Sequence, residues 1–71
     1  NIPFLADGFQ NRAIANMNTN NLAQALKDAT RSIDLDPDVS GRYSVRASVY
    51  RKLGKIALAE ADEATVARLR K

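Results

Sequence analysis

The segment Phe9-Gln-Asn-Arg-Ala13 returns in similar form as Tyr43-Ser-Val-Arg-Ala47. We call the distance along the chain from Phe9 to Tyr43 the repeat period. The same period separates further pairs of equal or similar residues: Leu22 and Ile56, Ala25 and Ala59, Asp28 and Asp62, Leu35 and Leu69. A fixed period of this length, combined with helical spacing of apolar residues, indicates a repeat in which each unit buries its apolar face against a neighbour. The period predicts an all-α chain of two tandem helix-turn-helix hairpins.

Apolar spacing places the first hairpin. Phe9, Ala13 and Met17 predict a first helix over residues 7–18, and the Asn-rich run 18–21 predicts the turn that ends it. A second helix is expected from residue 21 or 22 to residue 35, where Pro37 biases the preceding residue out of the helical region.

The pattern then restarts for the second hairpin. Tyr43, Ala47 and Tyr50 predict a third helix, Gly54 predicts its left-handed C-terminal cap, and Ile56 is expected to open a fourth helix. Small side chains let paired helices approach closely, which is the role expected for Ala13, Ala25, Ala47 and Ala59. Larger side chains are assigned to core and inter-repeat packing: Phe9, Leu22, Tyr43, Tyr50 and Ile56.

Several motifs resemble the tetratricopeptide repeat family: Phe9-Gln-Asn-Arg-Ala13, Asn20-Asn21-Leu22 with Ala25, Leu35-Asp-Pro37, and in the second unit Tyr43-Ser-Val-Arg-Ala47, Tyr50, Leu53-Gly54 and Ala59. The resemblance covers nearly the whole chain and implies a right-handed α-solenoid fragment. It implies one domain over residues 1–71, with repeat 1 at residues 6–39 and a terminal repeat 2 at residues 40–71. Three residues depart from the family pattern, Asn16, Ala29 and Glu63, and the charge of Glu63 indicates the end of an array.

Residues 1–5 have two interpretations. Pro3 lies one repeat period before Pro37, so this segment matches the closing residues of an upstream repeat; otherwise it forms a short extended arm. Because stacked repeats usually need about three units for stability, and because the chain does not begin with Met, we expect a fragment of a longer array or pairing with another copy.

Composition argues against catalysis. The chain has no Cys and no His, which removes thiolate and imidazole chemistry, and its net charge of +3 is a mild bias. The acidic cluster Asp34, Asp36 and Asp38 is interpreted as a helix-ending turn rather than a cation site, and Glu60 with Glu63 marks no substrate pocket. We therefore expect no enzyme activity, no catalytic residue, no metal and no cofactor; the compartment is left open, with the cytoplasm as the default.

In the resembled family, ligands bind in the groove formed by the first helix of each unit. Register places a mixed polar surface there, from which the predicted peptide-binding residues are Gln10, Asn11, Ile14, Ser44, Ser48, Arg51 and Lys52. Amides, hydroxyls and a cationic end suit a peptide segment of a partner protein with acidic character.

The carboxylate clamp of chaperone-binding repeats is matched only in part. Asn11 stands at its central Asn position, but Gly41 and Val45 occupy positions where a Lys and an Arg are required. A complete clamp is therefore not expected.

Two alternatives from other classes stay open. The basic cluster Arg42, Arg46, Arg51, Lys52 and Lys55 would meet RNA phosphates, although its members fall on several helix faces. The chain is otherwise a structural module that self-associates through exposed repeat faces. No membrane partner is expected, because no helix keeps a strongly apolar face free for insertion.

Overall fold

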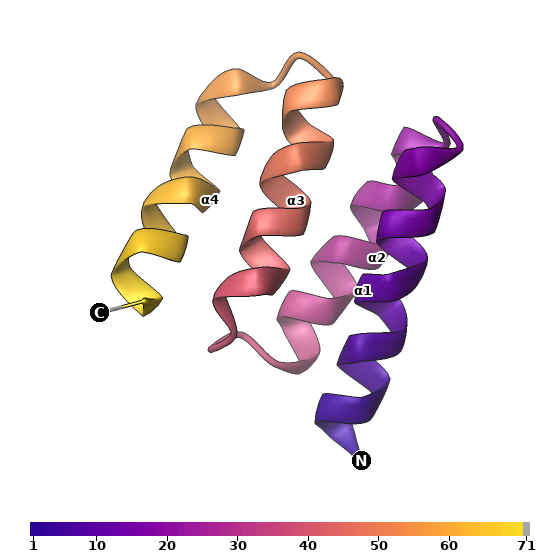
Figure 1. Ribbon diagram of the computed structural model, residues 1–71, viewed down its shortest axis with the longest axis vertical. Helices are drawn as coiled ribbons and strands as arrows, with labels where there is room; N and C mark the ends of the chain where they lie inside the picture. Colours follow the sequence, from indigo (N-terminus) through magenta and orange to yellow (C-terminus); the bar gives the residue numbers. More distant parts are fainter. Residues whose placement is uncertain (71) are drawn as a thin grey trace.

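The computed structural model describes residues 1–70. Within this range the chain forms four helices and no strand: α1 (Ile2–Asn18), α2 (Leu22–Leu35), α3 (Ser40–Lys52) and α4 (Ile56–Leu69). The chain reverses at each connection, so α1 and α3 run in one direction and α2 and α4 in the other (Figure 1). The all-α prediction is confirmed.

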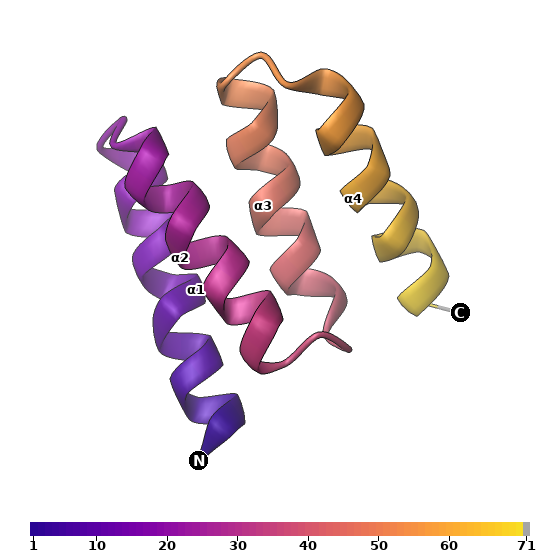
Figure 2. The same ribbon diagram turned by 180° about the vertical axis from the view of Figure 1, so that it is seen from behind.

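Helix α3 is the central element. It contacts α1, α2 and α4, whereas α4 packs only on α3 within the described residues. Both ribbon views place α3 between the α1/α2 pair and α4 (Figure 2). The long axis of the molecule measures 29 Å and the short axis 15 Å, so the helices form a flat, compact arrangement.

The two turns within the helix pairs are alike. Asn20 has φ of 64° and Gly54, which occupies the same place in the second unit, has φ of 77°. In each turn a backbone N–H donates across it, from Asn21 to Asn16 at 2.7 Å and from Lys55 to Tyr50 at 2.8 Å. The positive φ of Gly54 confirms the predicted left-handed cap. Gly and Asn stand at these two positions because they adopt positive φ more readily than other residues.

Helix α1 begins at Ile2, earlier than the apolar spacing predicts. The Asn1 side chain accepts a hydrogen bond from the Phe4 backbone N–H at 2.9 Å, and Pro3 lies in the first turn, where a missing N–H costs nothing. Residues 2–5 are thus the first turn of α1, not an extended arm. The corresponding residues 36–39 of the second unit form the loop between α2 and α3.

Small side chains occupy the core. The predicted contacts at Ala13, Ala25, Ala47 and Ala59 are confirmed, since all four are buried, together with Ala6, Ala29, Ile33 and Val49. The core assignment of Ile56 is wrong, because this side chain is 44% exposed. Ile56 is the first residue of α4, and no described helix covers the outer side of α4. The other large side chains, Phe9, Leu22, Tyr43 and Tyr50, are half-buried.

Candidate functional site

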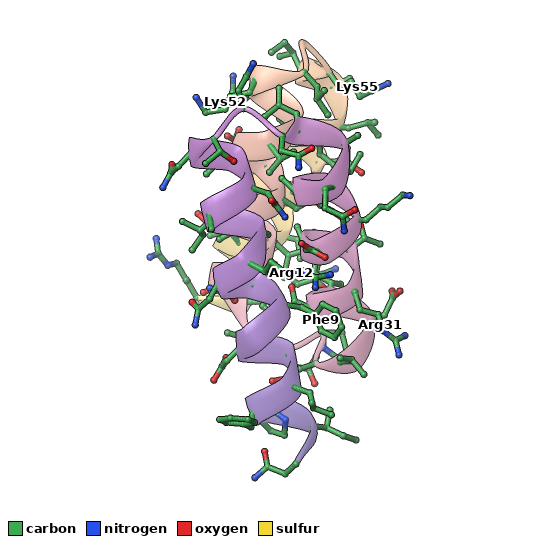
Figure 3. The ribbon with its side chains drawn as sticks, turned by 90° about the vertical axis from the view of Figure 1, so that its right-hand side faces the viewer. Phe9, Arg12, Arg31, Lys52 and Lys55 are labelled. Carbon is green, nitrogen blue, oxygen red and sulfur yellow. The ribbon has the colours of Figure 1, made fainter. Side chains whose placement is uncertain are left out.

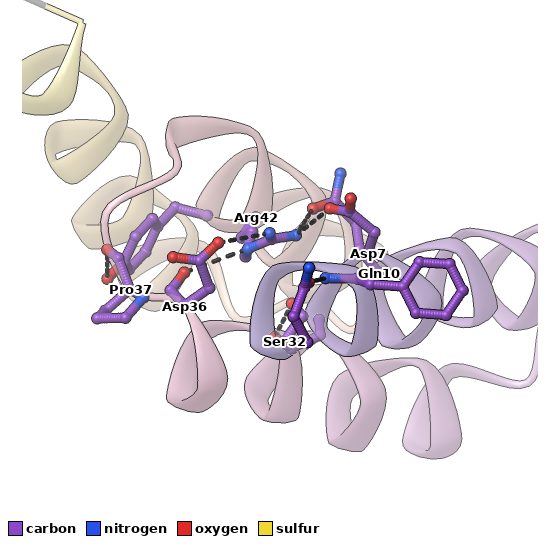
Figure 4. Close-up of polar contacts among 10 residues, drawn as sticks. Asp7, Gln10, Ser32, Asp36, Pro37 and Arg42 are labelled. Atoms are coloured by element: carbon purple, nitrogen blue, oxygen red, sulfur yellow. Dashed lines mark hydrogen bonds and ion pairs between the residues drawn. The ribbon is translucent and has the colours of Figure 1, made fainter.

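The Arg42 guanidinium joins the first pair of helices to the second. It is 2% exposed and donates to the Asp36 carbonyl at 3.2 Å, the Asp36 carboxylate at 2.8 Å and the Asp7 carboxylate at 3.0 Å (Figure 4). It also donates to the Gln10 side-chain oxygen at 2.8 Å. One side chain on α3 therefore fixes α1 and the α2–α3 loop, using donors in a rigid planar fork.

This contact orients Gln10, one of the predicted binding residues. Because its oxygen accepts from Arg42, its amide nitrogen faces Gly41, where an added Cβ would lie 3.7 Å from it. The Gln10 amide group therefore offers N–H donors at the line where α1 and α3 meet.

Equivalent ion pairs hold the two helices of each hairpin together. Arg12 donates to Asp28 at 2.9 and 2.7 Å between α1 and α2, and Arg46 donates to Asp62 at 2.8 Å through both nitrogens between α3 and α4. Asp28 and Asp62 are both buried. Bidentate pairs of this kind set helix position as well as adding stability.

The Asp28 carboxylate accepts hydrogen bonds from three side chains, those of Arg12, Asn16 and Gln24. The Arg12 hydrogen bonds hold the pKa of Asp28 below its usual value, against the opposing effect of burial, with further help from Gln24 and Asn16. Asn16 thus donates to Asp28 at 2.9 Å, whereas its counterpart Tyr50 places its ring 5.6 Å from the Arg46 guanidinium. This explains how the chain accommodates an amide at position 16.

Five of the seven predicted binding residues lie in two rows, one on α1 and one on α3, and Asn11 and Arg51 lie beside them. Gln10 and Ile14 lie one turn apart on α1, and Ser44, Ser48 and Lys52 follow one another at successive turns along one face of α3. Asn11 and the three residues on α3 are exposed, while Gln10 and Ile14 are half-buried. Helix α1 contacts α3, and the repeat period relates Gln10 to Ser44 and Ile14 to Ser48.

Arg51, one of the predicted peptide-binding residues, is exposed and forms an ion pair with Glu63. It donates to both Glu63 oxygens at 2.8 and 2.7 Å, and these bonds lower the pKa of Glu63. Arg51 is therefore an ion-pair partner that links α3 to α4.

The proposed basic cluster is also largely paired. Arg42 is buried among carboxylates and Arg46 is bound by Asp62. Lys52 and Lys55 take part in no ion pair within residues 1–70 and lie near the same end of the molecule (Figure 3).

The ion pairs within the two hairpins were not predicted, although the sequence contains one regularity that indicates them. Arg12 precedes Asp28 by the same interval that separates Arg46 from Asp62, so opposite charges recur at one spacing in both units. Arg42 gave no such signal, because its counterpart in the first unit is Gly8.

Two further classes of site are absent from the described part of the chain. Residues 1–70 contain no group of three or more acidic side chains placed to hold a metal ion, and Asp36 of the acidic turn is paired with Arg42. None of the helices in this range combines the length and apolar character needed to cross a membrane. Comparison of the chain with protein-family models, curated proteins and solved structures gives no match.

Proposed function

We propose that this chain is a non-enzymatic scaffold of tetratricopeptide type, a right-handed solenoid fragment that holds a peptide segment of a partner protein along α1 and α3. The internal repetition supports the repeat assignment. The ion pair within each hairpin, the left-handed turn residue and the buried alanines all recur at the repeat period.

One observation carries the binding proposal: the row on α3 is polar and exposed, and Arg42 holds α3 against α1, whose row adds the half-buried Gln10 and Ile14. Residues four apart on a helix are separated by about 6 Å along its axis, so each row offers contacts at regular steps. A rigid surface binds at lower entropic cost than one that must be ordered by its ligand.

The chemistry of the rows selects the ligand. Gln10 offers N–H donors, Ser44 offers a hydroxyl, and Lys52 adds a positive charge at the C-terminal end of α3. The Ser48 hydroxyl donates to the Ser44 backbone carbonyl at 3.2 Å, so it offers its oxygen as an acceptor. A segment rich in carbonyl acceptors, with an acidic residue near Lys52, is complementary to this arrangement. The pairing of Arg42, Arg46 and Arg51 removes most of the charge that the RNA alternative requires.

A charge-reversal comparison tests the proposal. A panel of short acidic peptides, with neutral amide versions of each, is titrated with the chain by fluorescence anisotropy. Lys52→Glu is expected to weaken the acidic peptides about tenfold, whereas Lys55→Glu, the same change outside the rows, has a much smaller effect. Equal losses in both variants, or no binding by any peptide, would contradict the proposal.

A further inference from the structure

The Arg42 guanidinium faces two carboxylates, one more than its charge requires. The Asp36 side chain, at 2.8 Å, is 25% exposed, whereas the Asp7 side chain, at 3.0 Å, is 66% exposed. Figure 4 shows the guanidinium between these two side chains. Only one Asp7 carboxylate oxygen accepts a hydrogen bond from a side chain within residues 1–70, so the other oxygen is open to a donor from outside the chain.

Asp7 and Lys52 mark opposite ends of the two rows. Asp7 precedes Gln10 by about one turn of α1 and contacts the first turn of α3 through Arg42, while Lys52 is the last residue of α3. The helical rise from Arg42 to Lys52 amounts to about 15 Å. The exposed charge is therefore negative at one end of the rows and positive at the other.

The repeat itself requires neither of these charges. The repeat period relates Asp7 to Gly41 and Lys52 to Asn18, so each charge stands in one unit only. By contrast, the ion pairs that hold the two hairpins together recur in both units. Charges that lie outside the repeated pattern, at the two ends of one surface, favour recognition of a ligand of complementary charge.

We propose that the two rows bind an extended peptide segment with charges of both signs, a basic side chain at Asp7 and an acidic one at Lys52; this inference rests on the proposed function. The N–H donors of Gln10 need a carbonyl acceptor, which an extended segment leaves free and a helix uses internally. At about 3.3 Å per residue, an extended segment spans 15 Å in about five residues. The two charges of the ligand should therefore lie about five residues apart.

The same polarity discriminates against ligands of a single sign. A segment that is acidic along its whole length meets repulsion at Asp7, and a wholly basic segment meets repulsion at Lys52. The acidic character of the ligand is thus confined to the end that lies near Lys52.

Fluorescence anisotropy with matched peptides tests the inference. Each peptide carries Glu at one end and Lys, Gln or Glu about five residues away, in both orders along the peptide, and a further peptide has Lys and Glu about two residues apart. In one of the two orders, the unchanged chain should bind the Lys peptide about threefold more tightly than the Gln peptide and about tenfold more tightly than the Glu peptide. The closely spaced Lys should add nothing.

Asp7→Asn isolates the charge of Asp7, because the Asn side-chain oxygen can still accept a hydrogen bond from Arg42. This variant should bind the Lys and Gln peptides equally. Asp38→Asn is the matched control, because Asp38 is an exposed aspartate of the loop between α2 and α3 and lies outside the rows. It should retain the preference for the Lys peptide, and circular dichroism checks that both variants stay helical.

The outcomes separate this inference from the proposed function. If peptides bind but the Lys, Gln and Glu versions bind alike, or if Asp7→Asn keeps the preference for Lys, the inference is overturned and the proposed function stands. If no peptide binds, the proposed function fails and this inference fails with it.

Discussion

Arg12 donates two hydrogen bonds to Asp28, at 2.9 and 2.7 Å, across the contact between α1 and α2. Arg46 and Asp62 repeat this arrangement between α3 and α4 at 2.8 Å. Each helix pair is therefore held by a buried carboxylate on its second helix and an arginine at a matching position on its first.

Asp28 should make the stability of the chain depend on pH in the acidic range. Its pKa is lowered in the folded state, so its stabilising effect is present above the unfolded pKa of about 3.9 and is lost as the pH falls through the lower folded value. Asp28→Asn should lower the free energy of unfolding by about 1–3 kcal/mol at pH 7.

Urea unfolding at a series of pH values measures this effect. Asp28→Asn should show a smaller loss of stability on acidification than the unchanged chain. The control is Asp38→Asn, because Asp38 is exposed and forms no ion pair within residues 1–70. If Asp28→Asn and the unchanged chain lose stability in parallel, Asp28 has been assigned the wrong role.

Arg42→Lys should destabilise the chain by about 1–3 kcal/mol, because a lysine keeps the charge but loses the planar fork that reaches Asp36, Asp7 and Gln10 together. Arg31→Lys, an exposed position on α2, should change stability little. Thermal unfolding followed by circular dichroism compares the two, and equal melting temperatures would show that Arg42 does not hold the helix pairs together.

Two glycine substitutions should have opposite signs. Gly54→Ala should cost about 1 kcal/mol because position 54 has φ of 77°, whereas Gly8→Ala should add about 0.5–1 kcal/mol because Gly8 lies inside α1 with open space beside it. Gly54→Asn should cost less than Gly54→Ala, since Asn20 adopts the same conformation in the first turn. Unfolding at low protein concentration measures all three, and an order other than this would contradict the assigned turn geometry.

Removing the ion pair at the far end should open that end to stacking. Arg51→Met together with Glu63→Ala installs the residue types of Met17 and Ala29, which are half-buried and fully buried in the first unit. We expect this double variant to form larger assemblies than the unchanged chain in sedimentation experiments. Arg68→Met with Glu60→Ala removes one charge of each sign at two other positions, both on α4, and should not enlarge the assemblies. If the two double variants behave alike, the Arg51–Glu63 ion pair does not close this end.

The sequence predicted the helices well where local chemistry decides them. Pro37 and Gly54 ended helices as expected, and the spacing of the alanines identified the tight helix contacts. The start of α1 was misplaced because the apolar spacing begins at Phe9, while the actual start depends on a cap at Asn1 and a first-turn Pro3. At this end of α1, Asn1 and Pro3, which lie outside the apolar stripe, indicate the start of the helix more accurately than the apolar spacing does.

The candidate site was predicted less completely, for a physical reason. Register placed Ser44, Ser48 and Lys52 on one face of a helix, which needs only helical periodicity. The engagement of Arg51 by Glu63, and of Gln10 by Arg42, depends on how helices meet in three dimensions. Contacts between residues on different helices leave no local pattern, and only the repetition of Arg12 and Asp28 as Arg46 and Asp62 could have revealed an ion pair in advance.

The most direct test of the account is a nitrogen-15 NMR titration of the chain with the tightest acidic peptide of the panel. Binding along the two rows predicts the largest amide shift changes at Gln10, Ile14, Ser44, Ser48 and Lys52, with small changes across α2 and α4. Changes centred on α2 or α4, or none at saturating peptide, would contradict the assignment of the binding surface to α1 and α3.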